Sequence, residues 1–421
     1  MILCHARSRC SLKTPRRKEK QITNRATKKE RAGSGGWCSF ASPVRLPVAE
    51  RVQCMKDPRV QRFAEILVDY STRVGKGDVV LINAAGLEAT PLVKEIYQLC
   101  LERGASYVEY GFSVPEIDRT FYNLANQQQL AHFPQHKLDF YKTLTVYIGI
   151  AAGENSMVMA NARQEAIVTY QKVTKPLIDQ RVKHTRWVVT RYPTHAAAQE
   201  ARMSLEEYEE YLFSACCIDW EQESRKQEKL KKLMDGTSRV RITAPDTDLS
   251  FSIGGMPGVK CDGRFNMPDG EVFTAPVRES VEGHITYNCP SIYQGKEFNA
   301  VRFEFSRGRI VAASAAGGMS DALNKILDTD DGARYIGEFA LGINPGIRTP
   351  MRNILFDEKI FGSIHLTPGQ AYDECDNGNR SAVHWDLVKV LTDGGEIWFD
   401  DVLIQKNGLF VLDALLELNP A

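Results

Sequence analysis

Four short segments in the second half of the sequence place carboxylate or imidazole side chains in apolar, strand-like surroundings. Glu271 opens GEVFTAP, Glu338 lies within GEFALG, and His365 lies within GSIHL. The fourth segment, SAVHWDLV, carries His384 and Asp386 two positions apart, so both would project from the same face of a strand. Carboxylates and imidazoles together are typical ligands of divalent metal ions.

Each residue alone has an ordinary explanation. A carboxylate beside a glycine is usually solvated or paired with an arginine, and a single histidine in a strand is usually a hydrogen-bonded core residue. The pair of His384 and Asp386 is harder to explain in this way, because two neighbouring ligand-type side chains are costly to bury without an ion. All five residues fall in one half of the chain, which favours a common site.

Charge considerations favour two metal ions over one. Three carboxylates that converge without cations repel one another, and some of them must take up protons. Two divalent ions would balance three carboxylates and one bridging hydroxide. A ligand set of carboxylates and imidazoles without thiolate suits zinc, cobalt or manganese. Such a pair activates water and stabilises an oxyanion, which predicts hydrolysis of an amide or an ester.

The first half of the chain has the pattern of an α/β domain. Apolar residues recur at helical spacing from position 57, after an Asp-Pro start signal, and a short buried strand follows at 79–83. Strands at 106–110, 145–150 and 187–191 then alternate with helical segments at 88–103, 116–143 and 160–180. This alternation predicts a mainly parallel sheet with helices on its faces.

After a charged helical stretch at 205–234 the pattern changes. Short, often alternating strands separated by Gly, Pro and Asp predict a β-rich α+β domain, and one helix is expected at 321–327. We therefore expect an α/β domain at 55–236 and a β-rich, metal-binding catalytic domain at 237–421.

Several function classes find no support. The chain lacks a GxGxxG fingerprint, a Walker A sequence and a GxSxG elbow, so a dinucleotide site, a P-loop and a serine hydrolase are not expected. The longest apolar runs, at 79–82 and 144–150, are far shorter than the roughly 18–20 residues of a membrane helix. We expect no membrane association.

The first 54 residues differ from the rest. They carry 13 lysines and arginines against 3 acidic residues in a chain of formal net charge zero, and they lack sustained periodicity. The remaining body is mildly acidic, so nucleic-acid binding is not expected. We interpret residues 1–54 as a disordered tail that precedes a true start at Met55. A transit peptide, a nucleic-acid arm and a nuclear signal are the alternatives.

The ten cysteines show no CxxC spacing, so a structural zinc site is not expected. Free thiols indicate a reducing compartment, which predicts a cytoplasmic protein.

The motifs GEVFTAP, GEFALG, GSIHL and SAVHWD, in this order, resemble those of the aminopeptidase T and aminopeptidase S family of metallo-aminopeptidases. A tyrosine seven residues after the histidine of GSIHL adds to the set, as do the VGKGDVVLI opening and the LERGA helix end. The resemblance extends from about Met55 to the C-terminus, and the basic tail has no counterpart in that family.

The resemblance implies a pair of divalent metal ions, a homodimer, and removal of N-terminal residues from peptides with a free amine. A hydroxide between the metals would attack the first peptide carbonyl. Glu271 and Glu338 are candidates for the bridging carboxylate and the general base, with Glu338 favoured as the bridge, and Tyr372 would donate to the oxyanion. Carried over by position, the metal ligands would be Glu271, Glu338, His365, His384 and Asp386.

Two alternatives remain from the residues alone. A two-metal esterase or phosphatase would use the same ligands, and a non-catalytic binding protein could retain the same scaffold. An intact set of five ligands argues against loss of activity.

Overall fold

The computed structural model describes residues 57–420, which belong to one compact unit. The basic tail and the expected start at Met55 lie outside the described residues, so both interpretations stay predictions.

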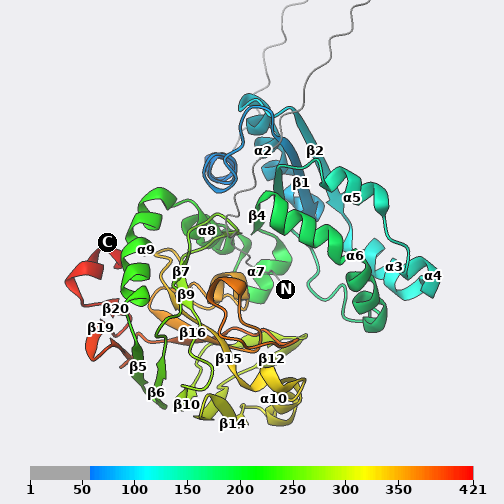
Figure 1. The fold of residues 1–421 in the computed structure, drawn as a ribbon. Coiled ribbons are helices and arrows are strands. Elements are labelled where there is room, and N and C mark those ends of the chain that lie inside the picture. The colour runs from blue at the N-terminus through cyan, green and yellow to red at the C-terminus, as the bar shows by residue number, and fades with distance from the viewer. Residues whose placement is uncertain (1–56, 421) are drawn as a thin grey trace, which may run out of the picture. The chain divides into compact units, whose positions relative to one another are not determined.

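The first half of the chain contributes four strands to a parallel five-stranded sheet, which confirms the predicted parallel sheet (Figure 1). The strand order is β2-β1-β3-β4-β8. The fifth strand comes from the second half of the chain and was not expected. The strands are β1 (Val79–Ala85), β2 (Tyr107–Ser113), β3 (Val146–Ala151), β4 (Arg186–Arg191) and β8 (Asn266–Met267).

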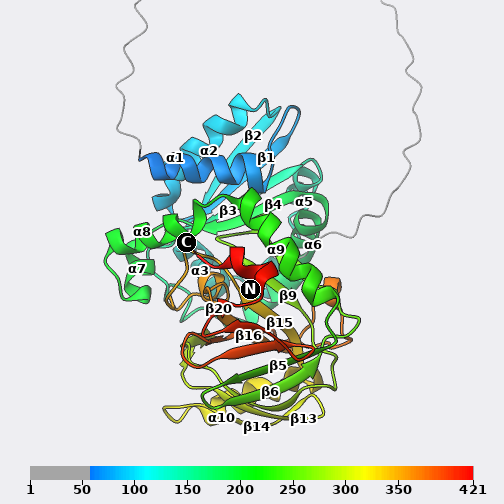
Figure 2. The same ribbon diagram turned by 90° about the vertical axis from the view of Figure 1, so that its left-hand side faces the viewer.

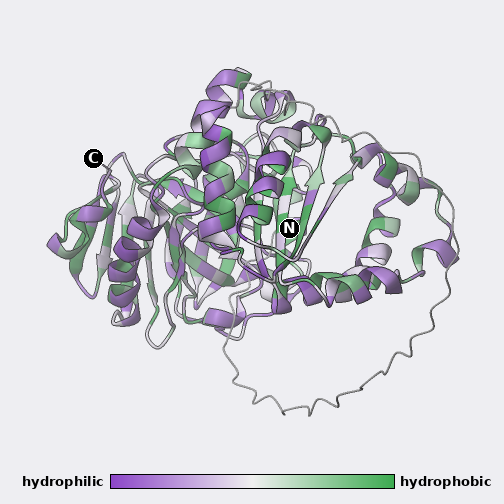
Figure 3. Cartoon of the chain, turned by 90° about the horizontal axis from the view of Figure 1, so that it is seen from above, coloured by the Kyte–Doolittle hydropathy of each residue, from purple (hydrophilic) through white to green (hydrophobic). Residues whose placement is uncertain are grey.

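Helices cover both faces of this sheet, because alternate strand residues point to opposite sides. Val80, Ile82 and Ile148 pack with the helices α1, α2 and α8, whereas Leu81 and Trp187 pack on the side of α5 and α6. Figure 3 shows the apolar strands between helices whose outer faces are hydrophilic. The helices are α1 (Pro58–Glu65), α2 (Thr90–Glu102), α3 (Pro115–Leu124), α4 (Gln127–Leu130), α5 (Gln135–Tyr141), α6 (Gln164–His184), α7 (His195–Ala201), α8 (Leu205–Cys216) and α9 (Trp220–Asp235).

Local sequence signals explain several helix ends. Asp57 caps α1 by accepting a hydrogen bond from the Arg59 amide, and Pro58 occupies the first helical position, as predicted. The helical segments expected at 116–143 are three helices, α3, α4 and α5. Asn126 starts α4 with a capping box, and Pro134 precedes α5, so the chain restarts its helix twice.

The second half of the chain is β-rich, as predicted. An eight-stranded antiparallel sheet has the order β14-β13-β10-β6-β5-β18-β19-β20, and β11 pairs with β12 in a separate hairpin. The strands are β5 (Arg239–Ala244), β6 (Thr247–Ser252), β10 (Glu282–Thr286), β11 (Ser291–Tyr293), β12 (Lys296–Phe298), β13 (Arg302–Ser306), β14 (Arg309–Ser314), β18 (Glu396–Phe399), β19 (Val402–Lys406) and β20 (Leu409–Phe410). The helices of this half are α10 (Ser320–Leu327) and α11 (Ile354–Asp357).

A second five-stranded sheet, with the order β17-β16-β15-β9-β7, packs one face on the eight-stranded sheet. Phe339 and Phe251 meet across the interface with ring centroids 4.9 Å apart. In Figure 2, β15 and β16 lie above β5 and β6. The strands are β7 (Val259–Cys261), β9 (Glu271–Thr274), β15 (Ile336–Gly342), β16 (Ser363–Pro368) and β17 (Leu387–Val390).

The character of the chain changes where the sequence indicated, because α9 ends at Asp235 and β5 begins at Arg239. The division into domains at residue 236 stays a prediction. None of the helices within residues 57–420 is long and apolar enough to cross a membrane.

Candidate metal centre

Three neighbouring strands carry polar side chains on one face of the antiparallel five-stranded sheet β17-β16-β15-β9-β7. Glu271 opens β9, Glu338 lies in β15 and His365 lies in β16. The register pairs Gly342 with Glu271, Ala340 with His365, and Glu338 with Thr367, so these residues share a face. The opposite face carries the apolar residues that pack on the eight-stranded sheet. Strand alternation therefore separates the hydrophobic core from the polar cluster.

His384 and Asp386 reach the cluster from a loop. A strand was expected at 382–388, but β17 begins only at Leu387, and His384 makes a single bridge to Gly369. The expected extent of this strand is wrong, because the segment before Leu387 is held by another loop. Asp330 of that loop accepts hydrogen bonds from the hydroxyl of Ser381 and the amide of Ala382, both at 2.7 Å.

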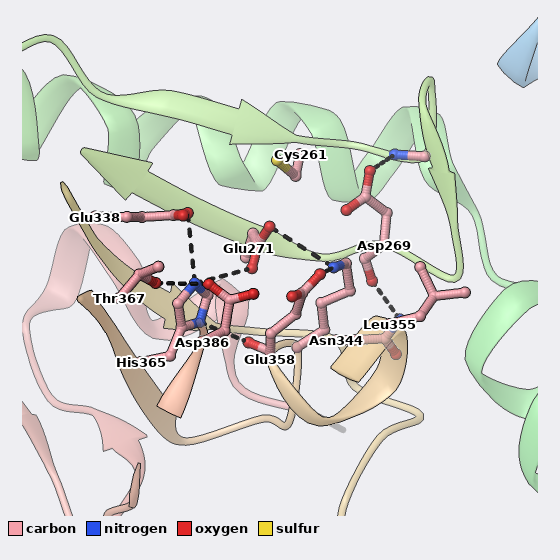
Figure 4. A network of polar contacts seen from close by, with 12 residues as sticks. Cys261, Asp269, Glu271, Glu338, Asn344, Leu355, Glu358, His365, Thr367 and Asp386 are labelled. Carbon is pink, nitrogen blue, oxygen red and sulfur yellow. Dashed lines mark hydrogen bonds and ion pairs between the residues drawn. The ribbon is translucent and has the colours of Figure 1, made fainter. Parts of the chain in front are cut away.

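The five residues form a continuous chain of contacts with Glu338 at its centre. Figure 4 shows four of them, Glu271, Glu338, His365 and Asp386. Glu338 Oε1 lies 3.4 Å from His365 Nε2, and Glu338 Oε2 lies 3.5 Å from His384 Nε2. His384 Nε2 lies 3.5 Å from Asp386 Oδ1, and His365 Nε2 lies 3.8 Å from Glu271 Oε2. The structure thus brings together all five residues singled out in the sequence.

Both imidazoles are oriented by backbone carbonyl groups. His365 Nδ1 donates to the carbonyl of Glu358 at 3.2 Å, and His384 Nδ1 donates to the carbonyl of Gln370 at 2.9 Å. A carbonyl oxygen only accepts, so each Nδ1 carries a proton and each Nε2 is directed toward Glu338. The hydroxyl of Thr367 donates to Asp386 Oδ1 at 2.6 Å and orients that carboxylate in the same way.

The carboxylates change the protonation of the buried imidazole. Burial disfavours the charged form of His365, but the hydrogen bond to Glu338 and the charge of Glu271 outweigh it and raise the pKa of His365 to about 10. The carboxylates therefore favour positive charge at this position of the cluster.

Sequence reasoning missed a buried lysine beside the cluster. Lys359 is fully buried, pairs with Glu358, and places Nζ 3.7 Å from Glu271 Oε1. The other carboxylate oxygen of Glu271, Oε2, is buried without a hydrogen-bond partner and faces His365. The run Asp-Glu-Lys between Phe356 and Ile360 was the available signal, because charged residues inside an apolar segment can be buried as a pair.

A second group of ligand-type side chains adjoins Glu271. The ligand atoms of Cys261, Asp269 and Glu271 lie within 4.8 Å of one another. Burial, only partly offset by the charge of Lys359, raises the pKa of Asp269 to about 8. Lys359 supplies positive charge next to this group, with Nζ 3.7 Å from Glu271 Oε1.

Replacing Lys359 by Met should destabilise the metal-free protein by about 3–5 kcal/mol, because it leaves the buried Glu358 and Glu271 without their cation. Added divalent metal should recover part of this loss. Urea unfolding with and without metal measures both values.

Lys389→Met is the matched control. Lys389 is also buried, but its ammonium donates to two backbone carbonyls, of Pro245 at 3.2 Å and Thr286 at 2.7 Å. Its loss should cost the same stability with and without metal. Equal behaviour of the two variants would contradict the role of Lys359 as the cation of the cluster.

A cavity of about 700 Å³ opens onto the cluster. Glu271, Glu338, His384 and Asp386 line it together with Tyr372. The Tyr372 hydroxyl lies 3.0 Å from His384 Nε2, and its ring packs against Phe273 and His384. A substrate in the cavity would therefore contact the carboxylates, the imidazole of His384 and the phenol of Tyr372 on the same wall.

The cluster has the properties of a site for divalent cations. Its donors are carboxylate oxygens and imidazole nitrogens, Glu271 Oε2 is buried without a hydrogen-bond partner, and three carboxylates converge in one place. The residues present therefore fit a metal centre.

Comparison with known proteins gives a consistent result. The family model described as thermophilic metalloprotease (M29) matches residues 56–408. Aminopeptidase T of Thermus thermophilus is 26% identical over 387 residues, which cover 78% of this chain and 91% of that protein. Aminopeptidase 2 of Geobacillus stearothermophilus is 24% identical over 352 residues, which cover 75% and 84% of the two chains.

Two solved structures share the fold. Wild-type AmpT from Thermus thermophilus superposes with a TM-score of 0.72 at 24% identity, covering 84% of this chain and 99% of that one. The 2,5-dihydroxypyridine dioxygenase from Pseudomonas putida KT2440 superposes with a TM-score of 0.55 at 14% identity, covering 85% and 98%. A hydrolase and a dioxygenase thus use one architecture, so the reaction must be argued from the side chains of the site.

Proposed function

We propose a two-metal mechanism for this chain, which belongs to the thermophilic metalloprotease (M29) family and is a metal-dependent aminopeptidase. The observation that carries the proposal is the position of Glu338, whose two oxygens face the two inward-directed imidazoles of His365 and His384. A carboxylate in this position suits a bridge between two cations. The residues that would hold the cations are Glu271, Glu338, His365, His384 and Asp386.

Two divalent cations, when bound, would supply the positive charge that the carboxylates lack and a water acidic enough to lose its proton near neutral pH. Zinc, cobalt and manganese suit the donor set. The free α-amine of the peptide would be received at the metal centre, which would account for a preference for terminal residues.

The chain's own residues would do the remaining work. Glu271, whose Oε2 is buried without a hydrogen-bond partner, is the candidate general base for the attacking water. The Tyr372 hydroxyl would donate to the oxyanion that forms on the scissile carbonyl. Gln370 and Glu358 would keep the imidazoles in place through their carbonyl groups.

Hydrolysis of an unblocked peptide, but not of its N-acetylated twin, is the expected result. Acetylation removes the charge of the amine while leaving the scissile bond unchanged. Amino-acid release is measured by chromatography, alongside the metal content of the same sample by elemental analysis. Equal cleavage of both peptides would indicate a general amidase or esterase, and a metal content of one ion per chain would contradict the two-metal centre.

We also propose a cytoplasmic homodimer. The family resemblance supports the dimer. The six cysteines within residues 57–420 form no disulfide, which supports a reducing compartment. Light scattering of the purified protein checks the mass of the assembly.

A further inference from the structure

The cavity has a second charged wall that the proposed mechanism leaves unused. Arg352, in the loop before α11, lines the cavity and has a side chain only 16% exposed. Its Nε atom is buried without a hydrogen-bond acceptor. Among the described residues one carboxylate lies within ion-pair distance, and Glu297 Oε2 is 3.7 Å from Nε, too far for a hydrogen bond. This contact with Glu297 is long, and the Arg352 side chain borders the cavity with part of its surface accessible.

The backbone holds this arginine in a strained conformation. Arg352 has a φ of 56°, in the left-handed region that residues other than glycine seldom adopt. The buried carboxylate of Asp357 fixes both neighbours, because it accepts from the amide of Met351 at 2.6 Å and from the amide of Asn353 at 3.0 Å. Residues kept in such conformations by their surroundings cluster at ligand-binding sites, since the strain persists only where the fold enforces it.

The cavity lining offers a place for each end of a short peptide. The candidate metal centre would receive the amine, and Arg352 and Arg191 contribute positive side chains to the same lining, which also holds Asp357 and Glu358. A guanidinium offers paired donors that fit the two oxygens of a carboxylate. A short peptide carries an amine at one end and a carboxylate at the other, so the metal centre and an arginine in one cavity would hold one end each.

The space and the remaining lining also suit such a ligand. The volume of about 700 Å³ lies within the range of roughly 300–1,000 Å³ that small-molecule sites occupy. Val168, Ile292 and Ile354 line the cavity and are exposed large apolar side chains. They would contact the side chains of the peptide between its charged ends.

We propose that Arg352 binds the C-terminal carboxylate of a di- or tripeptide, which makes this enzyme selective for short peptides. The proposal rests on the proposed function. Arg352 would act as a residue of substrate recognition and take no part in the chemical step.

The test compares the tripeptide Leu-Gly-Gly with its C-terminal amide. The wild-type protein should show a kcat/KM about 10- to 100-fold higher for the free acid, because a charge-assisted pair is lost in the amide. Arg352→Leu should lower kcat/KM for the free acid to the value for the amide. The kcat/KM for the amide should change by no more than about two-fold. Metal content should stay at the wild-type value.

Two further variants separate recognition from strain. Arg352→Gly suits the left-handed backbone, so it should keep or raise the thermal midpoint and still lose the discrimination. Arg352→Lys should keep part of the difference in kcat/KM between acid and amide, because lysine keeps the positive charge but lacks the paired donors. Arg241→Leu is the control, because Arg241 is exposed on β5, pairs with Asp248 and does not line the cavity.

Equal kcat/KM values for acid and amide in the wild type would overturn the proposal. An equal loss on both peptides in Arg352→Leu and Arg352→Gly would overturn it too, because the role would then be structural. Arg352→Leu could also lower kcat/KM for the C-terminal amide of Glu-Gly-Gly but not for the C-terminal amide of Gln-Gly-Gly. That result would show that Arg352 binds the side-chain carboxylate of the N-terminal residue, and it would refute the C-terminal assignment.

Failure of the proposed function gives a different result. A metal content of one ion per chain would contradict the two-metal centre and leave the comparison of acid and amide unaffected. If neither tripeptide is cleaved, calorimetric titration of the whole protein with Leu-Gly-Gly and its amide measures recognition alone. Tighter binding of the free acid, lost in Arg352→Leu, would support the role of Arg352, and equal binding would overturn it.

Discussion

Glu338→Gln is expected to lower turnover by a factor on the order of 10³ or more and to reduce the metal content below two ions per chain. Gln has nearly the same shape as Glu, so the packing of β15 stays intact while the charge that faces both imidazoles disappears. A neutral amide binds cations far more weakly than a carboxylate. Turnover of an unblocked peptide and elemental analysis of the dialysed protein measure the two effects.

Glu223→Gln is the matched control for this substitution. Glu223 is also buried, but it lies on α9 and pairs with Lys226 at 2.7 Å, away from the cluster. Its replacement should leave turnover and metal content at wild-type values. A full complement of metal in Glu338→Gln, together with normal turnover, would refute Glu338 as the bridging carboxylate.

The elements of the fold were largely predictable because their signals are local. Alternation of strands and helices up to residue 191 predicted the parallel sheet, and Gly-flanked apolar runs predicted the strands of Glu271, Glu338 and His365. Strand order was not predictable, because pairing depends on contacts between distant segments. The fifth strand of the parallel sheet, β8, comes from residues 266–267 for this reason.

The candidate site shows the same limit. The five polar residues were identifiable because each interrupts an apolar segment. Lys359 was not, since a run of Asp, Glu and Lys is usually solvated, and only the folded chain shows that its ammonium is buried against Glu271 and Glu358. The position of Arg352 at the cavity depends equally on tertiary structure, because its loop is held by Asp357 and its side chain approaches the β11–β12 hairpin.

Tyr372→Phe is expected to lower kcat by a factor on the order of 10² to 10³ with little change in KM, as for the loss of one oxyanion donor. The substitution removes only the hydroxyl, because the ring of Phe can keep the contacts with Phe273 and His384. Metal content and thermal midpoint should stay near wild type. Steady-state kinetics, elemental analysis and thermal unfolding measure these quantities on one preparation.

The structure sharpens this test, because the Tyr372 hydroxyl lies 3.0 Å from His384 Nε2, the atom that would bind a cation. If the hydroxyl acted only through His384, Tyr372→Phe would change metal affinity, and excess metal would restore turnover. Tyr70→Phe provides the structural comparison, since the Tyr70 hydroxyl donates to the carbonyl of Asp262 at 2.8 Å, and its loss should cost about 1–3 kcal/mol of stability with turnover unchanged. A catalytic Tyr372 must show the opposite pattern of intact stability and lost turnover, so wild-type turnover in Tyr372→Phe would refute its role.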